Sequence, residues 1–117
     1  MKNLFTILKQ EILIVYHDIN WRYTMRDEII DSYPDGMVCR IYDSINKCSI
    51  EFIDGTIITF INDKCTIGTP DADKVIIQHG VEESCVNTFL ENGVKVYVAT
   101  IEEATYYIPS YRELRKV

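Results

Sequence analysis

The chain has 117 residues, of which 47% are hydrophobic, and its formal net charge is −6. A chain of this length and apolar content forms a packed globule, so we expect one domain over residues 1–117. The negative charge argues against an extended nucleic acid as partner, because such binding depends on neutralising a row of phosphates. A small anion held by a few local arginines is compatible with this charge.

The sequence shows no signal for export or for insertion into a membrane. Residues 4–8 are mostly apolar, but Lys9, Gln10 and Glu11 interrupt them before the core of a signal peptide is complete. No apolar run reaches the length of a membrane span. We therefore expect a cytoplasmic protein without a membrane partner.

The four cysteines are widely spaced and contain no C-x-x-C pair: Cys39, Cys48, Cys65 and Cys85. Only two histidines are present to complete a metal site. Without an export signal, we expect reduced and mostly buried thiols and no metal. Disulfides or a scattered zinc site are the alternatives, since the number of cysteines is even.

The N-terminal part predicts a short helix, a strand and a second helix. Residues 3–9 suit a short helix, and residues 12–16, rich in Ile and Val, indicate a buried strand. A loop that includes Trp21 is expected next, and Thr24 is a suitable N-cap for the second helix. The expected buried face of that helix consists of Met25, Ile29 and Tyr33.

The middle of the chain predicts a β-hairpin. Two β-prone runs, residues 48–53 and 56–61, flank the Asp54-Gly55 pair, which suits a two-residue type I′ turn. Residues 37–42 are expected to add a third strand. In this register one face of the hairpin carries Cys48, Ile50 and Phe52, and the opposite face carries Ile53, Ile58 and Phe60.

A sheet with two apolar faces predicts self-association. Two or three short helices can cover one face well and the other poorly, which leaves an apolar patch that soluble monomers seldom expose. We therefore expect a homo-oligomer, with a dimer as the commonest form.

The C-terminal half is expected to alternate strands and helices. A polar loop over residues 62–73 precedes strands at residues 74–78 and 94–99, with a helix at 82–92 between them and a turn or short helix at 111–117. The helix should face inward through Cys85, Val86, Phe89 and Leu90, and end before Gly93. The expected class is α+β, with a mostly antiparallel sheet, a central β-hairpin and two or three short helices.

Catalytic motifs are mostly absent from the sequence. There is no Walker glycine loop, no G-x-G-x-x-G, no H-E-x-x-H and no G-x-S-x-G. His17 and Asp18 are adjacent, so on a strand they would point to opposite faces and could not act as a base with its orienting carboxylate. We expect no enzyme activity and no cofactor.

All five arginines lie near the two ends of the chain, and none lies between residues 41 and 111. Aromatic rings accompany them, and rings can stack on a nucleobase while guanidiniums hold phosphate. Ordinary packing with a surface ion pair is the alternative for these residues. The candidate ligand-binding residues are Trp21, Arg22, Tyr23, Arg26, Tyr107, Tyr111 and Arg112.

An alanine in place of Arg22, Arg26 or Arg112 is expected to lower nucleotide affinity by roughly tenfold or more, because a charge-assisted hydrogen bond is lost. The melting temperature should change little by comparison.

Several segments together resemble the small phage-encoded anti-Thoeris sponge proteins. The resemblance rests on Tyr16-His17, Arg22, residues 26–30, Tyr33-Pro34, residues 50–58 and residues 74–81. It implies capture of a cyclic ADP-ribose-type immune signal, and in some members of cyclic oligonucleotides, without degradation. The family pattern places an arginine beside the glycine after the hairpin, whereas Gly68 here lies between Ile67 and Thr69.

The hairpin, the glycine loop and the following apolar strand also resemble part of phage terminase motor ATPases. There the strand should end in acidic residues that position magnesium, but here it ends in Gln78-His79, so ATPase activity is not supported.

The expected function is that of a phage counter-defence protein that binds and sequesters a cyclic nucleotide signal. The alternative is a small acidic phage inhibitor, similar to anti-CRISPR proteins, that binds a host defence protein. A minor enzyme explains neither the arginines nor the acidic composition well.

Overall fold

The structure of the protein, a computed structural model, describes residues 10–33, 36–44, 47–53, 55–65, 72–91 and 93–100. The expected helix at residues 3–9 and the expected turn at 111–117 lie outside these ranges. Within them the chain forms, in order, β1 (Glu11–Tyr16), α2 (Ile19–Asp31), β2 (Val38–Asp43), β3 (Lys47–Phe52), β4 (Ile57–Asn62), the 3₁₀ turn η1 (Asp63–Cys65), β5 (Lys74–Gln78), α3 (Glu83–Glu91) and β6 (Lys95–Ala99).

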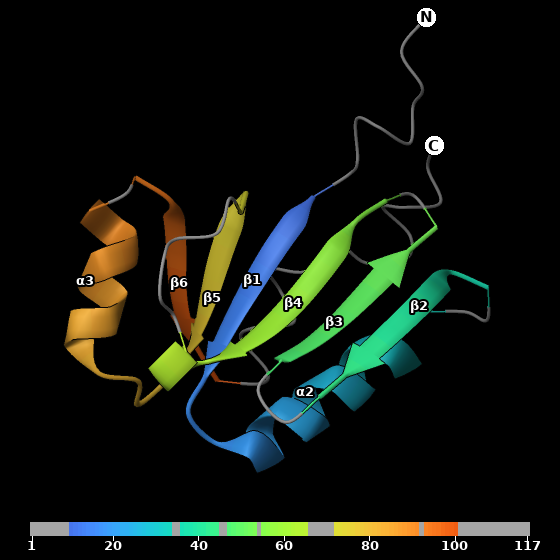
Figure 1. Ribbon diagram of the computed structural model, residues 1–117, viewed down its shortest axis with the longest axis horizontal. Coiled ribbons are helices and arrows are strands. Elements are labelled where there is room, and N and C mark those ends of the chain that lie inside the picture. Colours follow the sequence, from blue (N-terminus) through green and yellow to red (C-terminus); the bar gives the residue numbers. More distant parts are fainter. Residues whose placement is uncertain are drawn as a thin grey trace, which may run out of the picture.

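The six strands form one mixed sheet with the order β2-β3-β4-β1-β5-β6 (Figure 1). β1 pairs in parallel with both β4 and β5, and β5 pairs in parallel with β6. Antiparallel pairing is confined to β2, β3 and β4. The α+β class is confirmed. The antiparallel pairing that was expected for most of the sheet is found only among these three strands. Only β3 runs against the common direction, so the other five strands end at the same edge of the sheet.

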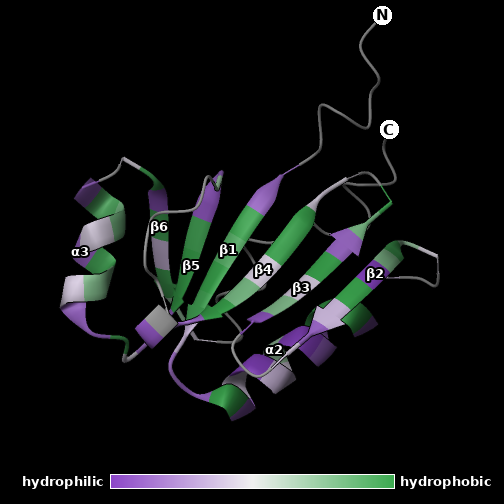
Figure 2. Cartoon of the chain, viewed as in Figure 1, coloured by the Kyte–Doolittle hydropathy of each residue, from purple (hydrophilic) through white to green (hydrophobic). Residues whose placement is uncertain are grey.

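β1 and β5 are interior strands of the parallel part of the sheet, and their composition explains their position. Residues 12–16 of β1 and 75–78 of β5 are all buried, as expected for parallel strands covered on both faces. Figure 2 shows these two strands as the most continuous hydrophobic stripe in the sheet. The sequence patterns predicted both strands, but not that β1 inserts between the hairpin and β5.

The two helices cover opposite faces of the sheet at opposite ends. Even-numbered residues of β1, such as Ile12 and Ile14, pack in one core cluster with Met25 and Ile29 of α2. Odd-numbered residues, Leu13 and Val15, pack in a second cluster with Phe89 of α3. Alternate side chains of a strand point to opposite faces, so each helix covers its own face. Figure 1 shows α2 along the β2 side and α3 along the β6 side.

Helix α2 begins earlier than expected, at Ile19, with Asp18 as its N-cap. The Asp18 carboxylate accepts a hydrogen bond from the backbone N–H of Asn20 at 2.9 Å. Thr24 is therefore inside the helix, where its hydroxyl donates to the carbonyl of Asn20 at 3.0 Å. The segment from Trp21 to residue 26 is helical, so the expectation of a loop before Thr24 was wrong. The predicted inner face of Met25, Ile29 and Tyr33 is confirmed as buried.

The hairpin between β3 and β4 has a longer loop than the expected two-residue turn. The N–H of Phe52 donates to the Thr56 carbonyl at 2.9 Å, and the N–H of Gly55 donates to the Phe52 carbonyl at 2.9 Å. Three residues, 53–55, therefore form the loop, and Gly55 has the positive φ, +93°, that closes such a turn.

The extra loop residue shifts the register of β4 by one. Ile50 opposes Ile58, and Cys48 opposes Phe60, so both β4 side chains lie on the buried face that α2 covers. The expected second apolar face, which was the premise for self-association, is therefore not formed by Ile58 and Phe60. Ser49, Glu51 and Thr59 occupy that outer face together with the part-buried Ile57 and Ile61.

Helix α3 is bound to the sheet mainly through Phe89, which is 1% exposed. Cys85 and Val86 pack beside it, as predicted. Leu90 is 53% exposed, so its predicted inward position was wrong. The helix ends before Gly93, whose φ of +74° suits the residue that follows a helix, as predicted.

The described cysteines do not form disulfides with one another. Cys39 is exposed, Cys48 is buried and Cys85 is partly buried, so among these three only Cys48 has the fully buried position that was expected for most of the thiols. The side chain of Cys65 lies outside the described part of the structure.

Candidate functional site

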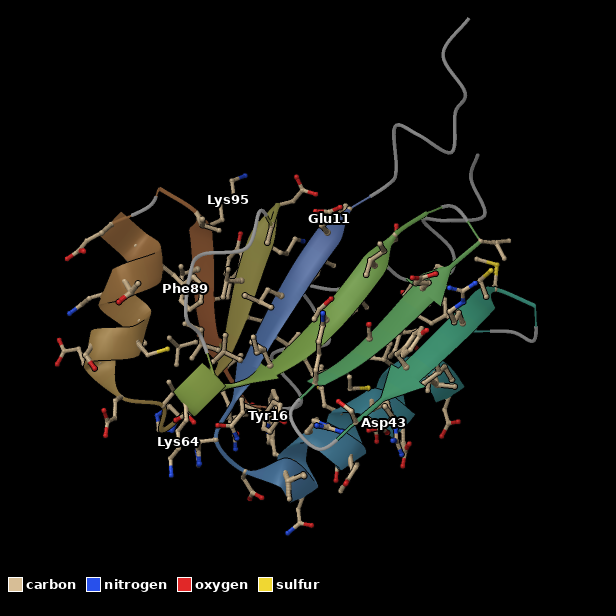
Figure 3. The ribbon with its side chains drawn as sticks, viewed as in Figure 1. Glu11, Tyr16, Asp43, Lys64, Phe89 and Lys95 are labelled. Carbon is tan, nitrogen blue, oxygen red and sulfur yellow. The ribbon has the colours of Figure 1, made fainter. Side chains whose placement is uncertain are left out.

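Two arginines of α2 meet one aspartate at the end of β2. Arg22 and Arg26 are four residues apart on the helix, so their side chains lie on the same face. Asp43, the last residue of β2, accepts a hydrogen bond on one carboxylate oxygen from Arg22 and on the other from Arg26. Figure 3 shows Tyr16 and Asp43 at the same end of the sheet, near α2.

Arg22 is the largest fully buried side chain of the described residues, with 0% exposure. One terminal nitrogen donates to the Tyr16 hydroxyl at 2.8 Å, and the other donates to the Ser44 carbonyl at 2.8 Å as well as to Asp43. A buried charge is stable only when it is paired and hydrogen-bonded. Arg22 therefore joins α2 to the ends of β1 and β2.

Tyr23 places its ring beside both guanidiniums. The ring centroid lies 5.3 Å from the central guanidinium carbon of Arg22 and 5.2 Å from that of Arg26. These distances allow cation–π attraction on a ring that is 40% exposed. Tyr16, Arg22, Tyr23, Arg26 and Asp43 together are called the arginine cluster below.

Together with the neighbouring Asp27, the arginine cluster is close to electrically neutral. Arg26 also contacts the Asp27 carboxylate, at 3.1 Å, so Asp27 and Asp43 provide two negative charges for two arginines. Burial acts to lower the pKa of Arg22, but the Tyr16 hydroxyl and the Asp43 carboxylate outweigh it, and the pKa is raised above its ordinary value. Arg22 stays charged, and its charge is compensated inside the protein.

Cys48 lies close enough to the arginine cluster for its charges to act on the thiol. Burial raises the pKa of Cys48, and the Asp43 carboxylate raises it further, while Arg22 and Arg26 act in the opposite direction. A buried thiol with a raised pKa is a poor nucleophile, which is consistent with a packing role.

The predicted ligand-binding residues fall into three groups. Arg22, Tyr23 and Arg26 come together in the arginine cluster. Trp21 is partly buried and packs against the core between the sheet and α2. The expected contribution of the C-terminal segment lies outside the described residues and stays a prediction; it concerns Tyr107, Tyr111 and Arg112.

The N-terminus of α2 is not an open anion site. Because Asp18 caps the helix with its own carboxylate, a phosphate placed there would meet a negative charge. The arginines lie one and two turns further along the helix, so they do not add to that N-terminus.

Sequence reasoning missed Asp43 and Tyr16. Tyr16 belongs to the family resemblance but has no predicted role there, whereas Asp43 lies in no motif and is 21 positions from Arg22 along the chain. The one available signal was general: a permanently charged arginine that cannot reach water needs a carboxylate, and an acidic chain offers many.

A second polar cluster lies between the ends of β1 and β5. These neighbouring strands lead into helices on opposite faces, and such a point is where open α/β sheets commonly bind ligands. Here the Gln78 side-chain oxygen accepts from the backbone N–H groups of His17, at 3.0 Å, and Asp18, at 3.2 Å. The His17 ring donates from Nε2 to the His79 carbonyl at 3.2 Å. The protein's own polar groups thus satisfy one another at this point.

The absence of a side chain at Gly80 leaves room for the His17 ring. A Cβ at position 80 would lie 2.9 Å from Nε2 of His17, and the φ of Gly80 is +103°. Asp18 caps α2 and does not orient His17, which agrees with the expectation that this adjacent pair is not a catalytic dyad.

Comparison with protein-family models, with curated proteins and with solved structures finds no match. Over the described ranges, neither α2 nor α3 is long and apolar enough to cross a membrane. The same ranges contain no group of three or more His, Cys, Asp and Glu side chains placed to hold a metal ion.

Proposed function

We propose that this protein is a non-catalytic inhibitor that binds a protein partner through the exposed surface of α2. This is the second of the two functions expected from the sequence. One observation carries the choice: Arg22 is buried, and both Arg22 and Arg26 are held by Asp43. Guanidiniums engaged in this way are poorly placed to receive the phosphates of a nucleotide.

The exposed surface of α2 has the composition of a protein-binding surface. Residues spaced by four positions form a continuous stripe on a helix. Here the first half of the stripe is apolar, with Ile19 39% and Tyr23 40% exposed, and the second half is acidic. The stripe consists of Ile19, Tyr23, Asp27 and Asp31, and is called the α2 stripe below.

The acidic residues near the end of α2 gain no stability from the helix dipole. Glu28 and Asp31 lie near its C-terminus, where the helix dipole disfavours negative charge, and the last turn contains no basic residue. The net charge of −6 adds to the negative potential. A partner with a basic surface would be attracted and oriented by this field. In the alternative function expected from the sequence, that partner is a defence protein of the host cell.

The test compares two double charge reversals. Cells carrying a defence system are challenged with phage while they produce the tagged wild type, the α2 variant Asp27→Lys/Asp31→Lys, or the control variant Glu82→Lys/Glu83→Lys near α3. The wild type and the control variant should restore phage growth and co-purify one component of the defence system. The α2 variant should lose both effects by tenfold or more, because two attractive contacts become repulsive, about 1.4 kcal/mol or more in total. An α2 variant as active as the wild type would rule out this surface.

Capture of a cyclic nucleotide is the second candidate, and the position of Tyr23 favours it. An exposed ring beside two guanidiniums is able to stack on a base while Arg26, 23% exposed, exchanges Asp27 for a phosphate. The protein is incubated with cyclic ADP-ribose isomers and cyclic oligonucleotides and then denatured, and the released ligand is identified by mass spectrometry. Intact ligand supports sequestration, an altered ligand indicates an enzyme, and no capture leaves the protein partner.

A further inference from the structure

We propose that β2 pairs with β2 of a second copy of this chain, in antiparallel register centred on Ile41. The observation that prompts this proposal is the exposure of β2. It is an edge strand of the sheet, and its side chains from Cys39 to Asp43 are all exposed. Ile41 is 47% and Tyr42 is 63% exposed, although both are large hydrophobic residues.

β2 lacks most of the features that protect edge strands from pairing. It contains no proline and no lysine, and its bulge lies at the start of the strand, between Val38 and Arg40. From Arg40 to Asp43 the pairing with β3 is regular. Among the described residues, no strand pairs with the outer edge of this regular part, which carries one positive and one negative side chain.

The backbone of β2 determines which residues face outward. The N–H of Ser44 donates to the Lys47 carbonyl at 2.8 Å, so this pair is hydrogen-bonded to the β3 side. Hydrogen-bonded and non-bonded pairs alternate along an antiparallel ladder, so Tyr42 also directs its backbone groups to β3. Ile41 and Asp43 consequently direct their N–H and C=O groups to the open edge.

Side chains select one register among those that the backbone allows. A twofold axis at Ile41 lets Ile41 of each copy exchange two hydrogen bonds with the other, and places the two Ile41 side chains in contact. It also places Arg40 opposite Tyr42 of the second copy, twice, in the closely spaced type of pair that suits cation–π contact. An axis at Arg40 would oppose two like charges, and an axis at Tyr42 would oppose Ile41 to Asp43.

The proposed dimer has a consequence for the α2 surfaces. The twofold axis is perpendicular to a continuous sheet, so equivalent faces of the two sheets lie on the same side. Both α2 helices would therefore face one direction, and a single partner molecule or assembly could contact two copies of the α2 stripe. The pairing itself does not depend on that function.

The test uses analytical ultracentrifugation of the full chain and three variants. The wild type should shift from the 13.6 kDa chain mass to twice that mass as its concentration rises to about 100 μM. Tyr42→Arg places two arginines opposite each other and should raise the dimer dissociation constant at least tenfold. Ile53→Arg is the matched control, because Ile53 is 55% exposed but lies in the hairpin loop, and it should dimerise like the wild type.

A charge exchange tests the register. Arg40→Glu combined with Tyr42→Arg puts opposite charges on the facing positions and should restore dimerisation relative to Tyr42→Arg alone. Circular dichroism checks that each variant is folded. A wild type that stays monomeric, a Tyr42→Arg variant that dimerises normally, or a double variant without recovery would each overturn the proposal.

Discussion

Asp43 determines what the two arginines of α2 can do. Its side chain is 33% exposed and accepts from both guanidiniums, while Arg22 beneath it reaches no solvent. The two ion pairs of Asp43 differ in burial. The pair with Arg22 lies in the interior, and the pair with Arg26 lies near the surface. A buried ion pair that loses one partner leaves an uncompensated charge, whereas a surface pair is worth little.

Arg22→Ala and Arg26→Ala should therefore have unequal effects on stability. We expect Arg22→Ala to lower the free energy of unfolding by about 3 kcal/mol, because it also removes the bond to Tyr16 and leaves a cavity. Arg26→Ala should cost less than about 1 kcal/mol. For Arg22, this differs from the sequence-based expectation that the melting temperature changes little by comparison with nucleotide affinity. Urea denaturation of both variants measures the difference, and equal losses would contradict the assignment of Arg22 as a structural residue.

Helix α3 shows how a short element depends on one side chain. It has nine residues, and Phe89 fills the space against Leu13, Val15 and Val75 of the sheet. Leu90 follows Phe89 by one position, about 100° around the helix, which turns it away from the sheet. The sequence could identify an amphipathic helix, but the angle at which the helix meets the sheet decides which of two adjacent apolar residues is inside.

Separate alanine substitutions of these two adjacent residues test which of them is buried against the sheet. Phe89→Ala should destabilise the protein by about 3 to 5 kcal/mol, since it removes a fully buried ring from the second core cluster. Leu90→Ala should change the free energy of unfolding by no more than about 0.5 kcal/mol. Thermal and urea unfolding provide the comparison. A large loss with Leu90→Ala would mean that α3 packs in a different rotation.

For the whole molecule, the protection of backbone amides from hydrogen exchange should decrease from the centre of the sheet to its edges. β1 has hydrogen-bonded neighbours on both sides and is buried on both faces, whereas β2 has one neighbour among the described strands and exposed side chains. Local opening requires less free energy where fewer buried contacts are lost. The sheet therefore combines a stable parallel centre with an edge suited to intermolecular contact.

Hydrogen exchange followed by NMR should show this gradient. In the Tyr42→Arg variant, which is expected to be monomeric, amides of Ile14 and Ile76 should exchange about a thousandfold or more slowly than that of Ile41. In the wild type at high concentration, Ile41 should gain protection. Uniform protection across the sheet of the monomer would contradict the proposed order of stabilities.

Several elements could be predicted because their signal is local in the sequence. Continuous Ile and Val runs identified β1 and β5, helical spacing identified the buried face with Met25 and Ile29, and the β-prone runs around Gly55 identified a hairpin. Each of these signals depends on residues within a few positions of one another, so the chain carries them without tertiary contacts.

Contacts between distant parts of the chain determine the register of β4, the neighbours of β1 and the partners of the arginines. One additional loop residue moved Ile58 and Phe60 to the covered face, although both loop lengths fit the sequence. The insertion of β1 between β4 and β5 joins segments that are more than 40 residues apart. Asp43 likewise meets Arg22 only because α2 lies under the end of β2. Strand pairing and ion pairing depend on distance in space, and a pattern along the chain does not contain that distance.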